Sequence, residues 1–356
     1  ASVEFAPQAA LDESQSYTVT VDAPGYRSAE LIRSTPGAPG AEESVDFGTL
    51  APEDVSVSAT AALGVTAPPG GVDARFTLTG PGETSRTLTA SLAEGESTAS
   101  VTFEGLSALG ADEVYTVTVD AVGYETAELA RTTPGAPGAG ETVEFGTLAA
   151  EDATLTVDAA LGVTAPRDGF PVTVEVAVPG GETVTRTVEL AAGESAVSET
   201  VALPAVDASQ RYAVTVGAER FADATGATYV APGESGTVDA GTLEPEDARV
   251  TVEADLGVTA PRDGFPVTVD VAVPGGEDAE RTVELAAGES AISETVTVAA
   301  VDADESYGVT VSAPGYAEAA ATGYVRPAGS GTLDAGTLAA DDVELTVPAT
   351  LGTAVP

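Results

Sequence analysis

The chain has 356 residues, with 57 Asp and Glu against 13 Arg and with neither Lys nor Asn, so its formal net charge is −44. It contains no Cys and no His, so disulfides and thiol or imidazole catalysis are excluded, and ordinary zinc or copper sites are not expected. Nucleic-acid binding is not expected either, because phosphate contacts need a basic face.

The acidic composition predicts a protein that folds in high salt. Repulsion at −44 opposes a compact state unless counter-ions screen it, and the Debye length falls to about 3 Å at 1 M salt. Hydrophobic residues make up 43% of the chain, which argues against a disordered acidic tail. An acidic surface without Lys is typical of salt-in halophiles, above all haloarchaea; an ordinary acidic extracellular protein is the alternative.

Three sequence markers recur along the chain at matching intervals. LGVTAP at Leu63–Pro68 returns at Leu161–Pro166 and Leu256–Pro261, and it appears as LGTAVP at Leu351–Pro356, with spacings of 98, 95 and 95 residues. The tripeptide GTL recurs with the same spacings, and a Tyr-x-Val-Thr-Val strand recurs with spacings of 98, 97 and 95 residues. The chain is therefore expected to be an array of tandem repeats.

These markers place complete repeats at 56–153, 154–248 and 249–343. Residues 1–55 match the second half of a repeat, and residues 344–356 match its first strand. We expect the partial ends to belong to a longer array. The alternative is that neighbouring subunits complete each other by strand addition.

Each repeat is predicted to form seven strands. In the third repeat these are Thr154–Leu161, Phe170–Val178, Thr185–Leu190, Val197–Leu203, Tyr212–Val216, Gly226–Val230 and Thr237–Leu243. Val and Thr alternate in the strands, and Pro-Gly or Gly-Gly turns separate them. The fold class is therefore all-β: immunoglobulin-like Greek-key sandwiches stacked into a rod by short linkers.

Two details of this fold follow from the pattern. Val172, Val174 and Val176 should face the core while Thr173 and Glu175 face outward, because alternate residues of a strand share a face. Tyr212 and Tyr307 each follow an acidic turn, where the tyrosine corner of a Greek-key sandwich would lie, and they should be largely buried.

A resemblance supports the same fold. The segment YTVTVDAPGY at Tyr17–Tyr26, followed by a short acidic strand and GTL, resembles the closing strands of carboxypeptidase-regulatory-like and related Ig-like repeats in haloarchaeal extracellular surface proteins. The resemblance covers a small part of each repeat. It implies a β-sandwich and an extracytoplasmic setting, and it implies no activity.

Calcium is the one metal for which the sequence offers a candidate site. Asp302, Asp304 and Glu305 place carboxylates within one loop, and Ca²⁺ prefers oxygen ligands. A solvated acidic turn is the alternative reading, since the other repeats lack the full pattern. No catalytic residues and no other cofactor are expected, because a nucleophilic Ser or Thr would have no His, Cys or Lys to activate it.

The expected role is structural. The repeats suggest an extracellular filament, a pilus-like fibre or a cell-surface stalk, with copies of the chain or adjacent repeats as partners. A spacer rod of an adhesin or of a halophilic virus fibre is one alternative, and a carbohydrate- or calcium-binding module is another. No run of about 18 apolar residues is present, so no direct membrane insertion is expected of this segment. Any secretion signal is expected to be removed or to lie outside it.

Overall fold

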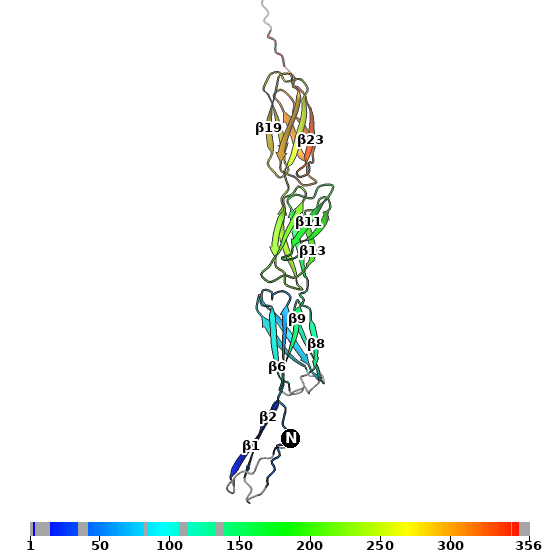
Figure 1. Ribbon diagram of the computed structural model, residues 1–356. Coiled ribbons are helices and arrows are strands. Elements are labelled where there is room, and N and C mark those ends of the chain that lie inside the picture. Colours follow the sequence, from blue (N-terminus) through cyan, green and yellow to red (C-terminus); the bar gives the residue numbers. More distant parts are fainter. Residues whose placement is uncertain are drawn as a thin grey trace, which may run out of the picture. The chain divides into compact units, whose positions relative to one another are not determined.

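The computed structural model describes residues 3, 15–34, 42–81, 85–106, 113–132, 138–342 and 344–348 (Figure 1). These residues form β-strands and no α-helix, which confirms the all-β prediction. Among them there is also no helix of the length and apolarity that a membrane crossing requires.

The strands form a hairpin followed by three complete repeats of seven. The hairpin consists of β1 Ser16–Ala23 and β2 Tyr26–Ser34. The second repeat contains β3 Val55–Leu63, β4 Val72–Thr79, β5 Ser85–Leu92, β6 Thr98–Leu106, β7 Val114–Ala121, β8 Ala127–Thr132 and β9 Gly140–Leu148. The third contains β10 Ala153–Leu161, β11 Phe170–Ala177, β12 Val184–Leu190, β13 Ala196–Leu203, β14 Tyr212–Ala218, β15 Ala224–Thr228 and β16 Ser235–Leu243. The fourth contains β17 Ala248–Leu256, β18 Phe265–Ala272, β19 Ala279–Leu285, β20 Ala291–Val298, β21 Tyr307–Ser312, β22 Ala319–Gly323 and β23 Ser330–Leu338.

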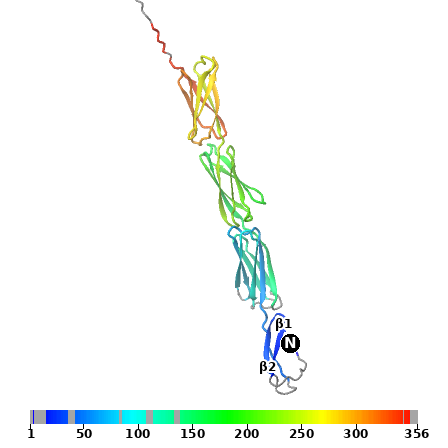
Figure 2. The same cartoon turned by 90° about the vertical axis from the view of Figure 1, so that its left-hand side faces the viewer.

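Each complete repeat is a sandwich of two sheets (Figure 2). One sheet has three strands in the order fourth, first, seventh, and the other has four strands in the order third, second, fifth, sixth. The first and seventh strands are parallel, as in β3 with β9 and β17 with β23. In the constant immunoglobulin domain the first and second strands share a sheet. Here they lie in opposite layers.

Alternation of Val and Thr explains how the strands form the core. Val172, Val174 and Val176 are fully buried, Thr173 is half-buried and Glu175 is exposed, so the inward face of β11 is confirmed. In the antiparallel register Val174 lies opposite Val216 of β14, another fully buried side chain. β-Branched residues suit this geometry, because their stiff side chains pack well on a pleated surface.

The tyrosine that opens the fifth strand is buried in every complete repeat. Tyr212 and Tyr307 have no exposed surface, as predicted. The Tyr307 hydroxyl donates a hydrogen bond to the carbonyl of Ala299 at 2.9 Å, eight residues upstream, as in a tyrosine corner. Tyr115 instead donates to the carboxylate of Glu141 at 2.7 Å. The acidic residues before Tyr17 and Tyr115 lie mostly outside the described residues.

These environments predict a late phase in an alkaline titration. Burial raises the pKa of Tyr307 to about 12 from an ordinary value of 10.0, and burial followed by the hydrogen bond to Glu141 also raises the pKa of Tyr115. A raised folded-state pKa contributes stability that is complete below pH 10 and is lost as the pH rises toward 12. Phenolate absorbance should therefore show a late phase that disappears in urea. A titration identical in folded and unfolded chains would contradict this.

In the described residues of the two partial repeats, two segments with strand sequences do not form strands. Residues 44–50 carry the sequence of a seventh strand but form no strand. Leu345 and Val347 are 81% and 72% exposed, whereas the equivalent Val250 and Val252 of β17 are fully buried. Within the same partial repeat as residues 44–50, β1 and β2 are strands, and they pair with each other.

The chain divides into two compact units that do not follow the repeat boundaries. The first contains Ala1–Ala153 together with two loops of the third repeat, Pro204–Gln210 and Val230–Ser235. The second contains Thr154–Leu203, Arg211–Tyr229 and Gly236–Pro356. These two loops of the third repeat are therefore grouped with the second repeat. The first strands of the complete repeats start at Val55, Ala153 and Ala248.

Candidate functional site

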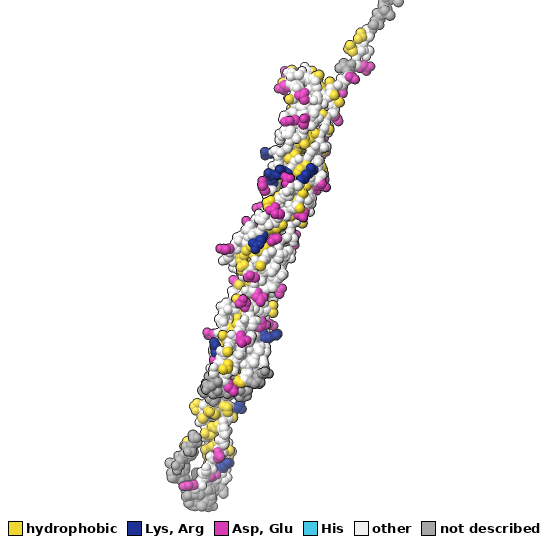
Figure 3. Space-filling model, turned by 90° about the vertical axis from the view of Figure 1, so that its right-hand side faces the viewer, with side chains coloured by type: hydrophobic (Ala, Val, Ile, Leu, Met, Phe, Trp, Pro, Cys, Tyr) yellow, Lys and Arg dark blue, Asp and Glu magenta, His cyan; other side chains and the backbone are white. Residues whose placement is uncertain are grey.

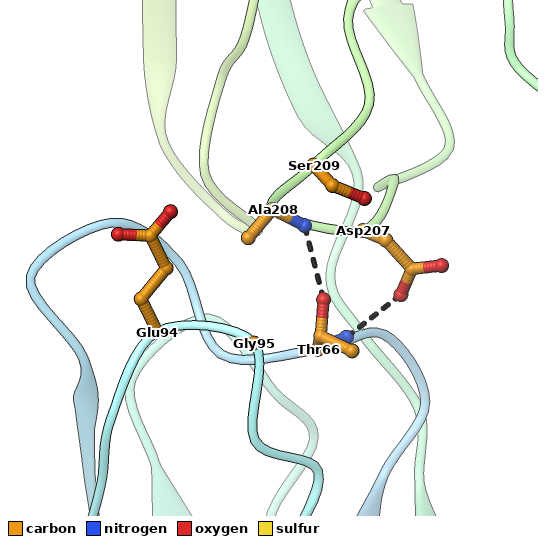
Figure 4. Close-up of a pocket in the computed structure, with 6 residues that line it drawn as sticks. All are labelled: Thr66, Glu94, Gly95, Asp207, Ala208 and Ser209. Carbon is orange, nitrogen blue, oxygen red and sulfur yellow. Dashed lines mark hydrogen bonds between the residues drawn. The ribbon is translucent and has the colours of Figure 1, made fainter.

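A reciprocal pair of hydrogen bonds joins two loops in the first unit (Figure 4). Thr66 lies in the LGVTAP loop after β3, and its backbone N–H donates to Oδ1 of Asp207 at 2.9 Å. In return the backbone N–H of Ala208 donates to the Thr66 hydroxyl at 3.0 Å. We call this four-atom exchange the clasp.

The same exchange occurs in the second unit between equivalent residues. The N–H of Thr164 donates to Oδ1 of Asp302 at 2.7 Å, and the N–H of Ala303 donates to the Thr164 hydroxyl at 2.8 Å. Here Arg167 adds two contacts. Its Nε donates to the carbonyl of Ala303 at 2.8 Å, and its guanidinium carbon lies 4.9 Å from the ring centre of Tyr324.

The chemistry of the clasp explains the residue types. Asp supplies a carboxylate acceptor, and hydrogen bonds to a charged acceptor are stronger than neutral ones. Thr supplies a hydroxyl that can accept from the backbone of the facing loop. The Thr loop is itself held in place: the N–H of Ala67 donates to the Glu96 carbonyl at 2.8 Å, and the Tyr124 hydroxyl donates to the Val65 carbonyl at 3.1 Å.

A second contact runs through the peptide that links successive repeats. Glu151 donates its N–H to the Gly123 carbonyl at 2.9 Å, and its own carbonyl accepts from the N–H of Gly233 at 3.3 Å. In the second unit Glu246 donates to Arg220 at 2.9 Å and accepts from Ala328 at 3.1 Å. The linker is thus hydrogen-bonded on both sides.

Backbones approach closely at the first of these linkers. Gly123 has a φ of +82°, and a Cβ there would lie 2.3 Å from the Pro232 carbonyl oxygen. Such a distance is impossible for a real side chain, so glycine is required at this position. Arg220 occupies the equivalent position in the third repeat with a φ of 74°, a strained conformation for a residue with a side chain.

Carboxylates are spread over the visible surface, with few arginines among them (Figure 3). One-to-one pairing with all 13 Arg would still leave 44 of the 57 acids without a cation (57 − 13). Among the described residues the ion pairs are peripheral: Arg27 lies 3.3 Å from Asp54, Arg220 lies 3.4 Å from Glu219, and Arg326 lies 3.9 Å from Asp168. Exposed pairs of this kind contribute little to stability.

The calcium candidate residues do not converge. Asp302 directs Oδ1 to the Thr164 N–H, Asp304 is exposed and Glu305 is half-buried. Within the described ranges, no three acidic side chains are grouped closely enough to hold a metal ion. The calcium site stays an untested hypothesis, which calorimetric titration with CaCl2 would address.

Sequence reasoning singled out Asp302 and the LGVTAP motif that contains Thr66 and Thr164, but it did not predict a contact between the two. The LGVTAP repeat was visible but suggested no role, and the aspartate five residues before the strand tyrosine suggested a metal ligand. The missing step is a contact between residues 141 positions apart, Thr66 and Asp207. The recurrence of both residues once per repeat, with 141 positions between Thr66 and Asp207 and 138 between Thr164 and Asp302, was the available signal.

The sequence matches no protein-family model and no curated protein sequence. Among solved structures it is similar to the Bacillus anthracis TIE protein, at 9% identity and a TM-score of 0.37, covering 92% of this chain and 60% of that one. It is also similar to a streptococcal ancillary pilin (10%, TM-score 0.24, 79% and 99% covered) and to the pilus adhesin SpaC from Lactobacillus rhamnosus GG (11%, TM-score 0.25, 87% and 47% covered). The chain thus spans 60% of the length of the first of these proteins. Likeness of this degree carries no information on function.

Proposed function

We propose that this chain is a structural repeat protein that forms or extends an extracellular filament, pilus-like fibre or cell-surface stalk of a halophile. The observation that carries the proposal is the clasp, which occurs with the same atoms at Thr66 and at Thr164. Repeats that served only as separate binding modules would not need matching side-chain contacts between their loops.

The linkers support the same role. Four residues separate β9 from β10, and four separate β16 from β17. Linkers this short, and hydrogen-bonded on both sides, favour repeats held in a fixed order and orientation over repeats that move independently. A stiff, extended element is the function that such junctions serve.

The amino-acid composition supports a structural role over a catalytic one. The chain has no Lys, His or Cys to act as base or nucleophile, and its carboxylates are distributed over the surface. Acidic side chains keep a protein soluble where salt is high, and like charges oppose unspecific association. These properties suit a structural element better than an enzyme.

The clasp can be tested in the second unit, because a chain without cysteine accepts labels only where they are introduced. Ser198 and Ser293 are exposed and occupy equivalent positions on β13 and β20. With spin labels at Ser198→Cys and Ser293→Cys, pulsed EPR should give a narrow distance distribution. Asp302→Ala should broaden it, because the Thr164 N–H loses its acceptor at a cost of about 1–2 kcal/mol.

Asp304→Ala is the matched control, since it removes the same charge from an exposed position in the same loop. It should leave the distribution narrow. Equal widths in the Asp302 and Asp304 variants, with circular dichroism unchanged, would show that the clasp does not fix the repeats and would remove the basis of the proposal.

A further inference from the structure

The chain enters a complete repeat through its first strand and leaves it through its seventh, and these two strands pair with each other in parallel. In the fourth repeat residues 249–256 of β17 lie opposite residues 330–338 of β23. In the second repeat residues 56–63 of β3 lie opposite residues 140–148 of β9 in the same direction. Because the paired strands run the same way, the chain enters at one end of the pair and leaves at the other.

This geometry determines how tension along the chain loads the hydrogen bonds. A pull on the chain before β17 and after β23 moves the two strands in opposite directions along their own length. Every bond between them is then stretched at once, beginning with the bond from the Arg249 N–H to the Gly329 carbonyl, 2.9 Å long, where the chain enters. Bonds loaded together share the force, whereas bonds at the opening end of a hairpin carry it one at a time.

Two of the recurring sequence markers meet at the end of the pair where the chain leaves. The N–H of Gly257, in the Leu-Gly-Val-Thr-Ala-Pro marker, donates to the carbonyl of Leu338, in the GTL marker, at 2.9 Å. A Cβ on Gly257 would lie 2.9 Å from that oxygen, so glycine permits the approach. The other two complete repeats have the same bond, at 2.8 Å from Gly64 to Leu148 and at 2.9 Å from Gly162 to Leu243.

The two strands are held unequally. β17 is the central strand of its sheet, with antiparallel β20 on its other side, whereas β23 is an edge strand that has β17 as its neighbour. The side chain of Leu338 at the end of β23 has no exposed surface. Since the chain contains no Cys, no disulfide can carry the load in place of these contacts. Detachment of β23 from β17 is therefore the step that tension has to drive.

We propose that the parallel pair of the first and seventh strands is the load-bearing element of each complete repeat and resists tension along the chain by shear. The inference rests on the proposed function, because a filament or stalk is pulled along its length. It adds a mechanical task that the sheet containing β18 and β19 does not share, since neither of those strands is where the chain enters or leaves the repeat. Resistance to force depends on the rate of unfolding, so this task is distinct from equilibrium stability.

Pulling the fourth repeat along two directions tests the proposal in the full chain. Asp247→Cys and Asp342→Cys place attachment points before β17 and after β23, at exposed positions. Asp255→Cys and Ala291→Cys place them on exposed residues that lie opposite each other on β17 and β20. Optical tweezers at one loading rate in molar KCl measure the unfolding force. The first pair should require a several-fold higher force, because the second pair opens the sheet bond by bond.

Two equal truncations then locate the load. Leu338 of β23 and Leu285 of β19 are both buried, so Leu338→Ala and Leu285→Ala remove the same atoms from opposite sheets. Both should lower the urea midpoint in molar KCl. With attachment at positions 247 and 342, only Leu338→Ala should markedly lower the unfolding force. Equal losses of force in the two variants would show that the whole core, and not the parallel pair, bears the load.

The comparison of directions needs neither truncation, so it decides the matter even if a truncated chain does not fold. Equal forces along the two directions would overturn the load-bearing pair. Such a result, together with an EPR distance distribution that Asp302→Ala broadens and Asp304→Ala does not, would leave the proposed function standing. Equal EPR widths in those two variants would instead remove the basis of the proposed function, whatever force the repeat withstands.

Discussion

The chain should be unfolded in dilute buffer and folded in molar KCl, with a melting temperature that climbs steeply between the two. Its net charge of −44 is spread over surfaces where at least 44 carboxylates cannot be paired with Arg. At about 0.01 M salt the Debye length is about 30 Å, so charges repel one another across a whole sandwich, whereas at 1 M it is about 3 Å and only adjacent carboxylates interact. Circular dichroism during thermal melting at increasing KCl measures the effect.

Variants can separate screening from general salting-out. Replacing exposed acids such as Glu175, Glu189 and Glu284 with Gln removes charge without changing the strand pattern. If repulsion dominates, an extensively substituted chain should melt higher in dilute buffer and depend less on KCl. If the salt instead acts by strengthening apolar burial, the melting temperature of the substituted chain and that of the parent chain should rise equally with KCl concentration. A melting temperature of the parent chain that does not respond to KCl would contradict the high-salt prediction altogether.

The alternation of apolar and polar residues along the sequence was sufficient to predict the strands. All seven strands predicted for the third repeat are present, with ends that differ by at most two residues. The reason is physical: Val172, Val174 and Val176 alternate with polar residues, and a period of two is compatible only with an extended chain that has one buried face. The same alternation correctly predicted the burial of Tyr212 and Tyr307.

The allocation of strands to sheets could not be read in this way. Pairing of the first strand with the seventh joins residues about a whole repeat apart, such as Val250 and Gly331, and nothing in either segment specifies a parallel partner. Alternation shows only that a strand has one buried face. It does not show which layer that face belongs to.

The clasp could not be predicted for a related reason. Asp302 appears in the sequence beside Asp304 and Glu305, so its neighbours along the chain suggested a calcium loop. In space its nearest partner is the N–H of Thr164, from another repeat. The repeats showed that the loop containing Thr164 and the loop containing Asp302 each recur along the chain. They did not show that the two loops contact each other.

Val174→Asp should unfold the third repeat. Val174 has no exposed surface and lies opposite the fully buried Val216, so an aspartate there would be an unpaired charge in an apolar core. Substitutions of this kind cost more than about 4 kcal/mol, a large fraction of the roughly 5–15 kcal/mol that stabilises a domain. Hydrogen exchange with mass spectrometry should show peptides from β10 to β16 exchanging at once in molar KCl, while peptides from the β17–β20 sheet stay protected.

The substitution Thr173→Asp is the matched control for Val174→Asp, because it introduces the same charge on the opposite face of β11. Thr173 is half-buried and points away from the Val172, Val174 and Val176 face, so Thr173→Asp should shift stability by at most about 1 kcal/mol. Val269→Asp repeats the test in the fourth repeat, where Val269 is equally buried and lies opposite Val311. If Val174→Asp and Thr173→Asp gave the same exchange pattern, the valine face could not be the core of the sandwich. If Val269→Asp left β17–β23 protected, the shared architecture of the two repeats would be wrong.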